Sequence, residues 1–216
     1  PAPNKRGWVV KGSAEYRKPP LTVECRAILP QRDAYNILVA SDSKSSSAHW
    51  EIFSSAGTGL FTAYTPGLAP NHTRSNVMLC DGKPHNVAMV YESKRLRLFV
   101  DGKMVADQAV ESSDGDVVEG GLAIGRLVEG KLSHVGTIDW VRISSVARSS
   151  LWTKEESPPE DKSTLLLWSP ETTTPKEHGA ELEGALFGST PQHSAILVKG
   201  FLERSKHGDP GRGLMV

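Results

Sequence analysis

Alternating apolar and polar residues between positions 80 and 149 constrain the fold of this chain most strongly. In residues 84–91, Val87 and Met89 alternate with less apolar neighbours, and in residues 95–100 Leu96 and Leu98 do the same. A repeat of two residues is the period of a half-buried β-strand. The second run ends in Asp101-Gly102, a dipeptide that accepts positive φ at a tight hairpin turn. The segment therefore predicts linked β-hairpins.

Composition extends this prediction to the whole chain. The 216 residues include 20 Gly and 14 Pro, and short alternating runs outnumber long amphipathic ones. These features favour an all-β fold over an α/β fold. The length suits one large sandwich or two small domains. We expect a main domain over residues 1–150, a linker with accessory strands that complete or pack on it over residues 151–190, and a tail or linker to another domain over residues 191–216.

Other segments carry more local expectations. Further strands are predicted at residues 7–11, 21–29, 36–40, 48–53, 60–64, 122–125, 136–143 and 164–168. Residues 65–76 contain two prolines and are expected to be irregular. The charged, proline-containing residues 151–162 are expected to form a short helical turn and a linker.

Several motifs resemble the laminin-G-like, concanavalin A-like jelly-roll family in its bacterial branch. They are Asp81-Gly82 followed by His85, the hairpin at residues 96–103, the strand at residues 122–125 and the closing strand at residues 136–143. Residues 20–30 resemble an early strand of that family. The resemblance covers residues 7–149 and implies an antiparallel β-sandwich of the concanavalin A-like jelly-roll type. It also implies an extracellular or periplasmic location within a larger exported protein.

Charge and hydropathy exclude some partners. The chain has 25 basic and 25 acidic residues, so no net field concentrates polyanions, and we expect no nucleic acid partner. No apolar run reaches the roughly 20 residues that a membrane helix needs, so no membrane span is expected. Because the sequence begins at Pro1 without a signal-peptide pattern, we expect a piece of a longer protein with other domains.

The sequence carries no recognisable catalytic motif. Glycoside hydrolysis needs two carboxylates held on either side of the scissile bond. The acids of residues 111–119 lie around Gly115 in what reads as a turn, which would not hold them in register. Motifs for serine hydrolases, nucleotide binding and zinc are also missing from the sequence. We therefore expect a protein that is not an enzyme, and we rank a glycosidase or lyase last.

Candidate ligand-binding residues lie in the loops and strands of the first half of the chain. Sugar recognition needs an aromatic platform for the apolar sugar face and fixed polar groups for the hydroxyls. Alternate strand positions place His49 and Glu51 on one face. We expect a recognition or adhesion module for carbohydrate or a protein surface, and the alternative is an architectural accessory domain of a multidomain enzyme. The candidate residues are Tyr35, His49, Glu51, Tyr64, His72 and Arg74.

The resemblance also bears on a metal ion and a disulfide. It implies a structural Ca²⁺ bound by Asp139, with oxygen ligands from an early loop around residues 13–15. The alternative is an ion pair between Asp139 and Arg142 or another basic residue. Cys25 and Cys80 fall in segments that the family places as strands of one sandwich, so they form either a disulfide or two buried thiols.

Overall fold

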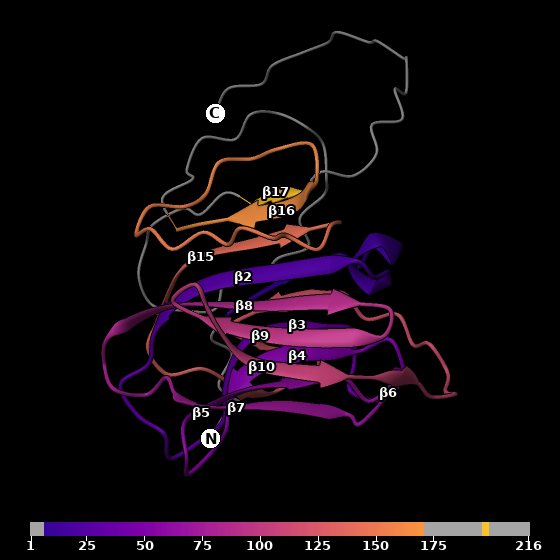
Figure 1. Ribbon diagram of the computed structural model, residues 1–216, viewed down its shortest axis with the longest axis horizontal. Coiled ribbons are helices and arrows are strands. Elements are labelled where there is room, and N and C mark those ends of the chain that lie inside the picture. The colour runs from indigo at the N-terminus through magenta and orange to yellow at the C-terminus, as the bar shows by residue number, and fades with distance from the viewer. Residues whose placement is uncertain (1–6, 171–195, 199–216) are drawn as a thin grey trace, which may run out of the picture.

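The chain forms two antiparallel sheets stacked face to face (Figure 1). The structure is a computed structural model that describes residues 7–170 and 196–198, the last three by their backbone alone. In spatial order, the six-stranded sheet contains β1 (Trp8–Val10), β12 (Leu122–Ile124), β3 (Asn36–Ser41), β4 (Trp50–Ser54), β5 (Leu60–Tyr64) and β7 (His72–Met78). The seven-stranded sheet contains β10 (Lys103–Ala109), β9 (Arg95–Val100), β8 (Pro84–Glu92), β2 (Leu21–Ile28), β15 (Thr137–Ser144), β16 (Thr164–Trp168) and β17 (Ile196–Val198).

Short elements complete the described part of the chain. A 3₁₀ helix, η1 (Ala14–Arg17), precedes β2. Two small sheets pair β6 (Leu68–Ala69) with β11 (Glu111–Ser112), and β13 (Arg126–Leu127) with β14 (Gly130–Ser133). Within the described residues, no helix has the length and apolar character needed to cross a bilayer. The prediction of an all-β antiparallel sandwich is confirmed.

The predicted hairpins form where the alternation placed them. Strands β8 and β9 pair from Val87 with Val100 to Glu92 with Arg95, and β9 pairs with β10 from Val100 with Lys103. The turn residues Asp101 and Gly102 have φ values of 50° and 77°. Positive φ at both central positions is the requirement of a two-residue turn whose twist matches the flanking strands.

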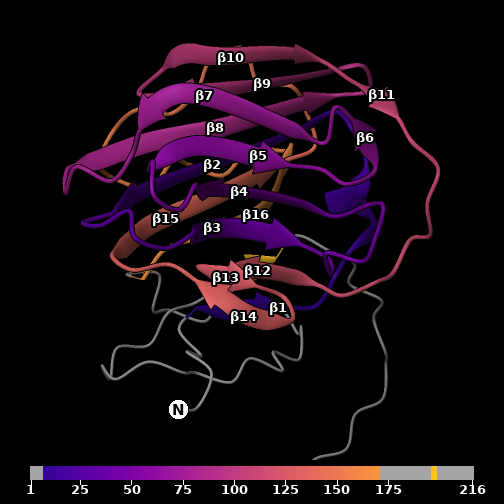
Figure 2. The ribbon, with the colours of Figure 1, turned by 90° about the horizontal axis from the view of Figure 1, so that it is seen from below.

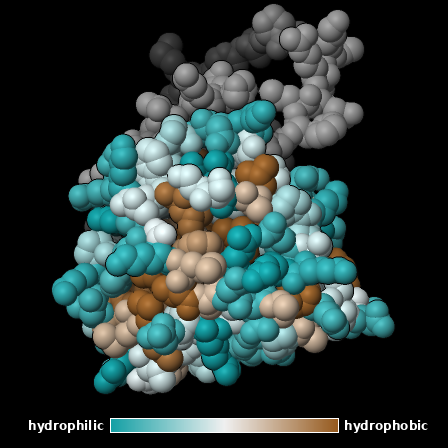
Figure 3. Space-filling view, viewed as in Figure 1, coloured by the Kyte–Doolittle hydropathy of each residue, from teal (hydrophilic) through white to brown (hydrophobic). Residues whose placement is uncertain are grey.

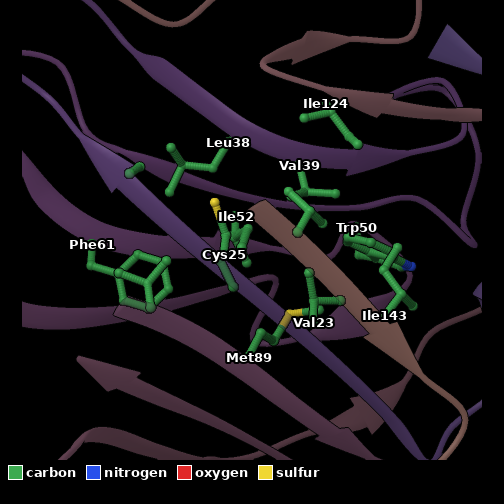
Figure 4. Packing of buried hydrophobic residues seen from close by; sticks show 14 of the residues in the cluster. Val23, Cys25, Leu38, Val39, Trp50, Ile52, Phe61, Met89, Ile124 and Ile143 are labelled. Carbon is green, nitrogen blue, oxygen red and sulfur yellow. The ribbon is translucent and has the colours of Figure 1, made fainter. Parts of the chain in front are cut away.

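The core lies between the inner faces of the two sheets. Figure 4 shows side chains from both sheets pointing toward one another, including Val23 of β2, Met89 of β8, Ile52 of β4 and Phe61 of β5. All four are fully buried. Non-directional apolar burial of this kind is the main favourable term in folding.

Strand β2 is buried on its outer face as well, because residues 145–163 cross over it. We call this segment the strap. The strap residue Trp152 donates its backbone N–H to Glu24 Oε1 at 2.8 Å. The Arg142 guanidinium donates to Glu24 Oε2 at 2.7 Å and to the carbonyl of Pro159 in the strap. Glu24 is only 1% exposed and Arg142 only 4% exposed. The ion pair is therefore removed from water, and the strap covers it.

More contacts fasten the strap to the sheet. Trp140 of β15 donates its indole N–H to the carbonyl of Glu155, and Asn86 of β8 donates to the carbonyl of Thr153. These bonds satisfy polar groups on the outer face of the seven-stranded sheet.

Figure 3 shows that the side of the molecule seen in Figure 1 is mostly hydrophilic, with a small hydrophobic area near its middle.

The structure corrects two local expectations. Residues 151–162 contain no helical turn and belong to the strap instead. Residues 65–76 are not irregular throughout, since they contain β6 and the start of β7. The inward side chains of β7 include Thr73 and Ser75, which are buried but polar, so the apolar alternation that marks the other strands is weak here.

The two cysteines are free thiols, so the disulfide alternative is wrong in this structure. Cys25 lies in the apolar core, where burial raises the pKa of its thiol. Cys80 donates its S–H to Ser54 Oγ and accepts a weak bond from the Asn36 side chain. Both sulfurs lie in the main apolar core, and no bond joins them. The domain boundaries expected above stay a prediction, and most of residues 171–216 lie outside the described part of the chain.

The buried ion pair under the strap leads to a stability prediction. Replacement of Glu24 by Gln removes the charge that Arg142 faces and leaves a buried cation without compensation. We expect the free energy of unfolding to fall by about 3 to 5 kcal/mol, measured by urea denaturation. As a matched control, Asp107→Asn breaks the exposed pair with Arg95 and is expected to change stability little. A similar small effect of both variants would contradict the role assigned to the strap.

Candidate ligand-binding face

Two rows of side chains cross the outer face of the six-stranded sheet. Figure 2 shows the backbone of its strands β3, β4, β5 and β7 side by side. In the first row, Glu51 of β4 pairs with Tyr64 of β5, and Tyr64 pairs with His72 of β7. In the second row, Phe53 pairs with Thr62, and Thr62 pairs with Arg74. Cross-strand neighbours of this kind lie close enough for their side chains to interact. Strand pairing thus brings four of the six candidate residues and their neighbours onto one surface.

The Tyr64 ring of the first row lies between the rings of His72 and His49. The ring centroids of Tyr64 and His72 are 4.6 Å apart, and those of Tyr64 and His49 are 5.8 Å apart. His49 is buried, whereas Tyr64 and His72 are half-buried. Tyr64 and His72 therefore present ring surface to solvent, and the buried His49 ring packs near Tyr64.

An ion pair between the partly exposed Lys44 and the buried Glu51 lies beside these rings. Lys44 Nζ is 2.8 Å from Glu51 Oε1 and 5.4 Å from the centre of the Tyr64 ring. The exposed Glu129 accepts a weak hydrogen bond from the backbone N–H of Lys44. Burial raises the pKa of Glu51, and the nearby Lys44 ammonium partly offsets that effect. Lys44 thus connects the serine-rich loop at residues 41–47 to the candidate face.

His49 and Glu51 each have one buried atom without a hydrogen-bond partner among the described residues: His49 Nε2 and Glu51 Oε2. These two atoms are 3.8 Å apart, which is too far for a direct hydrogen bond. His49 Nδ1 lies 3.1 Å from the carbonyl of Asp42, so this nitrogen carries the proton and donates it. Nε2 is then an acceptor that faces a carboxyl group. Burial lowers the pKa of His49 and keeps the ring neutral.

Arg74 and Tyr35 extend the face in two directions. Arg74 is exposed, and no carboxylate pairs with it among the described residues. Burial and the nearby charge of Arg74 both lower the pKa of His72. Tyr35 is 45% exposed, and its ring contacts Phe53 edge-on with centroids 5.7 Å apart. Tyr35 is therefore on the same side of the sheet as the other candidates but at a different part of it.

A small second core covers the β3 side of this face. The hairpin β13–β14 contributes Leu127 and Leu132, which pack with Ile37, Ala40 and Phe53 and against Tyr64. The hairpin leaves Arg74, Asn76 and Met78 of β7 exposed. The accessible part of the face is thus bounded by the hairpin and by the loop that carries Lys44.

Three residues that neighbour the candidates on this face were not among the predicted site residues. Lys44 lies in a serine-rich loop that reads as solvated, Phe53 was predicted only as a strand residue, and Glu129 belongs to a short hairpin without a strong pattern. Only the position of Phe53 held a usable signal, because it is two residues after Glu51 on one strand. The contacts of Lys44 and Glu129 depend on loop paths between distant segments.

The residues proposed for a calcium ion do not form a common donor set. The Asp139 carboxylate accepts a hydrogen bond from Arg26 at 3.0 Å, as the ion-pair alternative anticipated for a basic partner. Arg26 and Asp139 lie near the end of β2, whereas residues 13–15 precede its first residue, Leu21. The strand from Leu21 to Arg26 spans roughly 17 Å. Within the described residues, no group of three or more His, Cys, Asp or Glu side chains is arranged to hold a metal. Calcium binding stays a prediction.

The buried His49 leads to a prediction about pH. The pKa of His49 is lowered in the folded protein, below the ordinary histidine value of 6.5. As the pH falls below 6.5, His49 therefore takes up a proton in the unfolded chain before it does so in the folded protein. Stability contributed by neutral His49 is therefore present above 6.5 and lost as the pH falls toward its folded pKa. The loss should be about 1.4 kcal/mol for each pH unit between the two pKa values.

Urea denaturation at about pH 7.5 and about pH 5 checks this expectation. When the pH falls from about 7.5 to about 5, the free energy of unfolding should decrease more for wild type than for His49→Gln. His72 and Glu51 titrate in both proteins, so the difference isolates His49. Equal losses would show that His49 does not resist protonation.

Comparison with known proteins places the fold. The family model described as the concanavalin A-like lectin/glucanases superfamily matches residues 14–152. A candidate carbohydrate-binding protein from Bacteroides ovatus superposes with a TM-score of 0.60 at 16% identity, over 82% of this chain and 53% of that one. This chain thus spans about half the length of that protein. No curated protein matches the sequence.

Two weaker similarities involve smaller shares of this chain. The CBM40 domain of the Ruminococcus gnavus IT-sialidase superposes with a TM-score of 0.48 at 14% identity, over 60% of this chain and 77% of that one. Domains LG4-5 of the mouse laminin alpha1 chain superpose with a TM-score of 0.45 at 16% identity, over 64% and 40%. At these identities the likeness to solved structures concerns the fold alone. Because the family model matches more than half of the chain and the fold is a jelly-roll sandwich, the chain belongs to the concanavalin A-like lectin/glucanase superfamily.

Proposed function

We propose that this protein is a non-catalytic recognition module that binds carbohydrate on the outer face of the six-stranded sheet. The observation that carries the proposal is the ring pair of Tyr64 and His72, 4.6 Å apart and half-exposed, beside the exposed cation of Arg74. The ring pair provides an apolar platform of limited size. Arg74, Lys44 and the imidazole of His72 provide polar groups around it.

Such a combination matches the chemistry of a sugar. One side of a pyranose ring carries C–H groups that pack on an aromatic face, and its rim carries hydroxyls that need hydrogen-bond partners. The Arg74 guanidinium has several N–H donors, and no carboxylate among the described residues pairs with them. Tyr35, which lies elsewhere on the same face, offers a second ring for a ligand longer than one sugar unit.

A binding role explains this face better than a catalytic one. Hydrolysis of a glycosidic bond needs two carboxyl groups that reach the substrate. Glu51 is buried to 1% exposure and paired with Lys44. No hydrogen bond joins Arg74 to His49 or Glu51 among the described contacts, so these residues lack the arrangement that would favour a lyase or hydrolase. The chemistry of the face supports binding without bond cleavage.

The setting of the module is part of the same proposal. The resemblance to exported bacterial proteins supports an extracellular or periplasmic location and neighbouring domains in a longer chain. An architectural role, with no ligand at all, is the competing function. A binding measurement distinguishes the two functions, because an architectural role does not require the exposed ring pair or the unpaired cation of Arg74.

The proposal is tested by affinity electrophoresis through gels that contain soluble polysaccharides, both neutral and acidic. We expect wild type to be retarded by at least one of them. His72→Ala and Arg74→Ala should each weaken the affinity on the order of tenfold, because each removes an exposed contact without opening the core. Isothermal titration calorimetry with the selected polysaccharide measures the same change in solution.

A matched control lies on the other sheet. Met104 of β10 is 55% exposed, and Met104→Ala removes a similar amount of exposed side chain far from the proposed face. It should leave the affinity unchanged. Retardation that persists in His72→Ala and Arg74→Ala, or that is lost in Met104→Ala, would move the site elsewhere. No retardation by any polysaccharide would favour the architectural role.

A further inference from the structure

Two buried hydrogen-bond acceptors face each other beside Tyr64. His49 Nε2 and Glu51 Oε2 are 3.8 Å apart, and the two residues are only 2% and 1% exposed. His49 donates its one ring proton from Nδ1 to the carbonyl of Asp42, so the neutral ring has no proton left at Nε2. Neither acceptor has a hydrogen-bond partner among the described residues. Their facing lone pairs cost free energy as long as no proton lies between them.

A single proton would satisfy both atoms at once. An imidazolium donates from Nε2 as well as from Nδ1, and a carboxylate oxygen accepts such a bond with the help of its charge. To reach hydrogen-bond distance, the two atoms have to approach each other by about 1 Å. The proton comes from the solvent, and no covalent bond between heavy atoms forms or breaks. The pair is therefore arranged to take up one proton.

Lys44 compensates the same carboxylate from its other side. Its Nζ is 2.8 Å from Glu51 Oε1, so the ammonium balances the buried negative charge while the proton is absent. A proton shared by His49 and Glu51 makes that pair neutral, and the carboxylate then no longer requires the ammonium. Of the three side chains only Lys44 reaches water, because it is 38% exposed. Lys44 is thus the group that can leave.

The charges around the pair couple the proton to Lys44. Burial lowers the pKa of His49 and the charge of Lys44 lowers it further, whereas backbone hydrogen bonds and the charge of Glu129 raise it. Burial raises the pKa of Glu51, Lys44 opposes that rise, and Glu129 adds to it. Lys44 therefore disfavours the proton at both groups. By linkage, the proton disfavours the docked position of Lys44 to the same extent.

The loop around Lys44 confines the movement to a short segment. On one side, Asp42 is fixed by the Arg17 guanidinium at 2.7 and 3.1 Å. On the other side, Ser46 Oγ accepts two backbone hydrogen bonds. Only residues 43–45 lie between these anchors. Release of Lys44 is therefore a local change that leaves the rest of the loop in place.

We propose that His49 and Glu51 form a proton-operated latch for Lys44. Without the proton, Lys44 is docked on Glu51, with its Nζ 5.4 Å from the centre of the Tyr64 ring. When the pair takes up a proton, His49 bonds to Glu51 and Lys44 moves into solvent. Acidification below pH 6.5 thus withdraws a positive charge from Tyr64 without moving the sheet. The latch concerns the loop itself and holds whether or not the face binds carbohydrate.

NMR on the full chain tests the latch as the pH falls from about 7.5 to about 5. The ring nitrogen signals of His49 report its protonation, and the side-chain proton signals of Lys44 report its position relative to the Tyr64 ring. We expect both sets of signals to change with one common midpoint. Lys44→Gln removes a cation that disfavours the proton, so the His49 midpoint should move to higher pH.

Two further variants each hold the latch in one state. Glu51→Gln is uncharged and can donate to His49 Nε2, so Lys44 should show its low-pH signals already at about pH 7.5. His49→Gln does not titrate, so Lys44 should keep its docked signals throughout. His72→Gln is the matched control, because it removes a titrating ring next to Tyr64 that does not contact the pair, and it should behave as wild type does.

Four results would overturn the proposal. They are Lys44 signals that stay constant while His49 takes up its proton, Lys44 signals that still change in His49→Gln, docked Lys44 signals in Glu51→Gln, and a His49 midpoint that Lys44→Gln does not raise. The Glu51→Gln arm is measured at about pH 7.5, so it decides even where acid unfolds the protein. Lys44→Gln changes a partly exposed side chain, so it provides a folded variant for the reciprocal test.

Discussion

The burial of β2 on both faces is the constraint on which the rest of the structure depends. Its inward residues, such as Val23 and Cys25, pack between the sheets, as any sandwich strand requires. Its outward residues are polar, and Glu24 is buried with them. A buried carboxylate is tolerated only when it is paired and hydrogen-bonded. Arg142 of the adjacent β15 and the backbone of the strap meet this requirement, so the strap is part of the folded unit.

The two outer faces consequently differ in what they offer to a ligand. The strap covers the outer face of the seven-stranded sheet over β2, β8 and β15, and it bonds to polar groups of these strands. On the six-stranded sheet, a short hairpin covers only the β3 side and leaves the β7 edge open. Exposed rings and the free cation of Arg74 gather at this edge. This asymmetry explains why we place ligand binding on one sheet and not on the other.

The strands and the site were predictable to different extents. Strands such as β8 and β9 follow from alternation, and Asp101-Gly102 marks their hairpin, because both signals are local. Alternation also puts His49 and Glu51 near one another. The contact between Glu51, Tyr64 and His72 depends on the register of three strands, which the sequence does not state. The strap has no periodic pattern, and Glu24 and Arg142 are 118 positions apart, so their pairing was not predictable.

Backbone amide NMR during titration with an oligosaccharide from a retained polysaccharide tests the central claim most directly. Binding to the ring platform should shift the amide signals of Tyr64, His72, Arg74 and their neighbours on β5 and β7. The signals of β8, β9 and the strap should remain in place, because these elements lie on the opposite side of the core. Shifts confined to the strap side, or a spectrum that does not change at saturating ligand, would contradict a carbohydrate site on the six-stranded sheet.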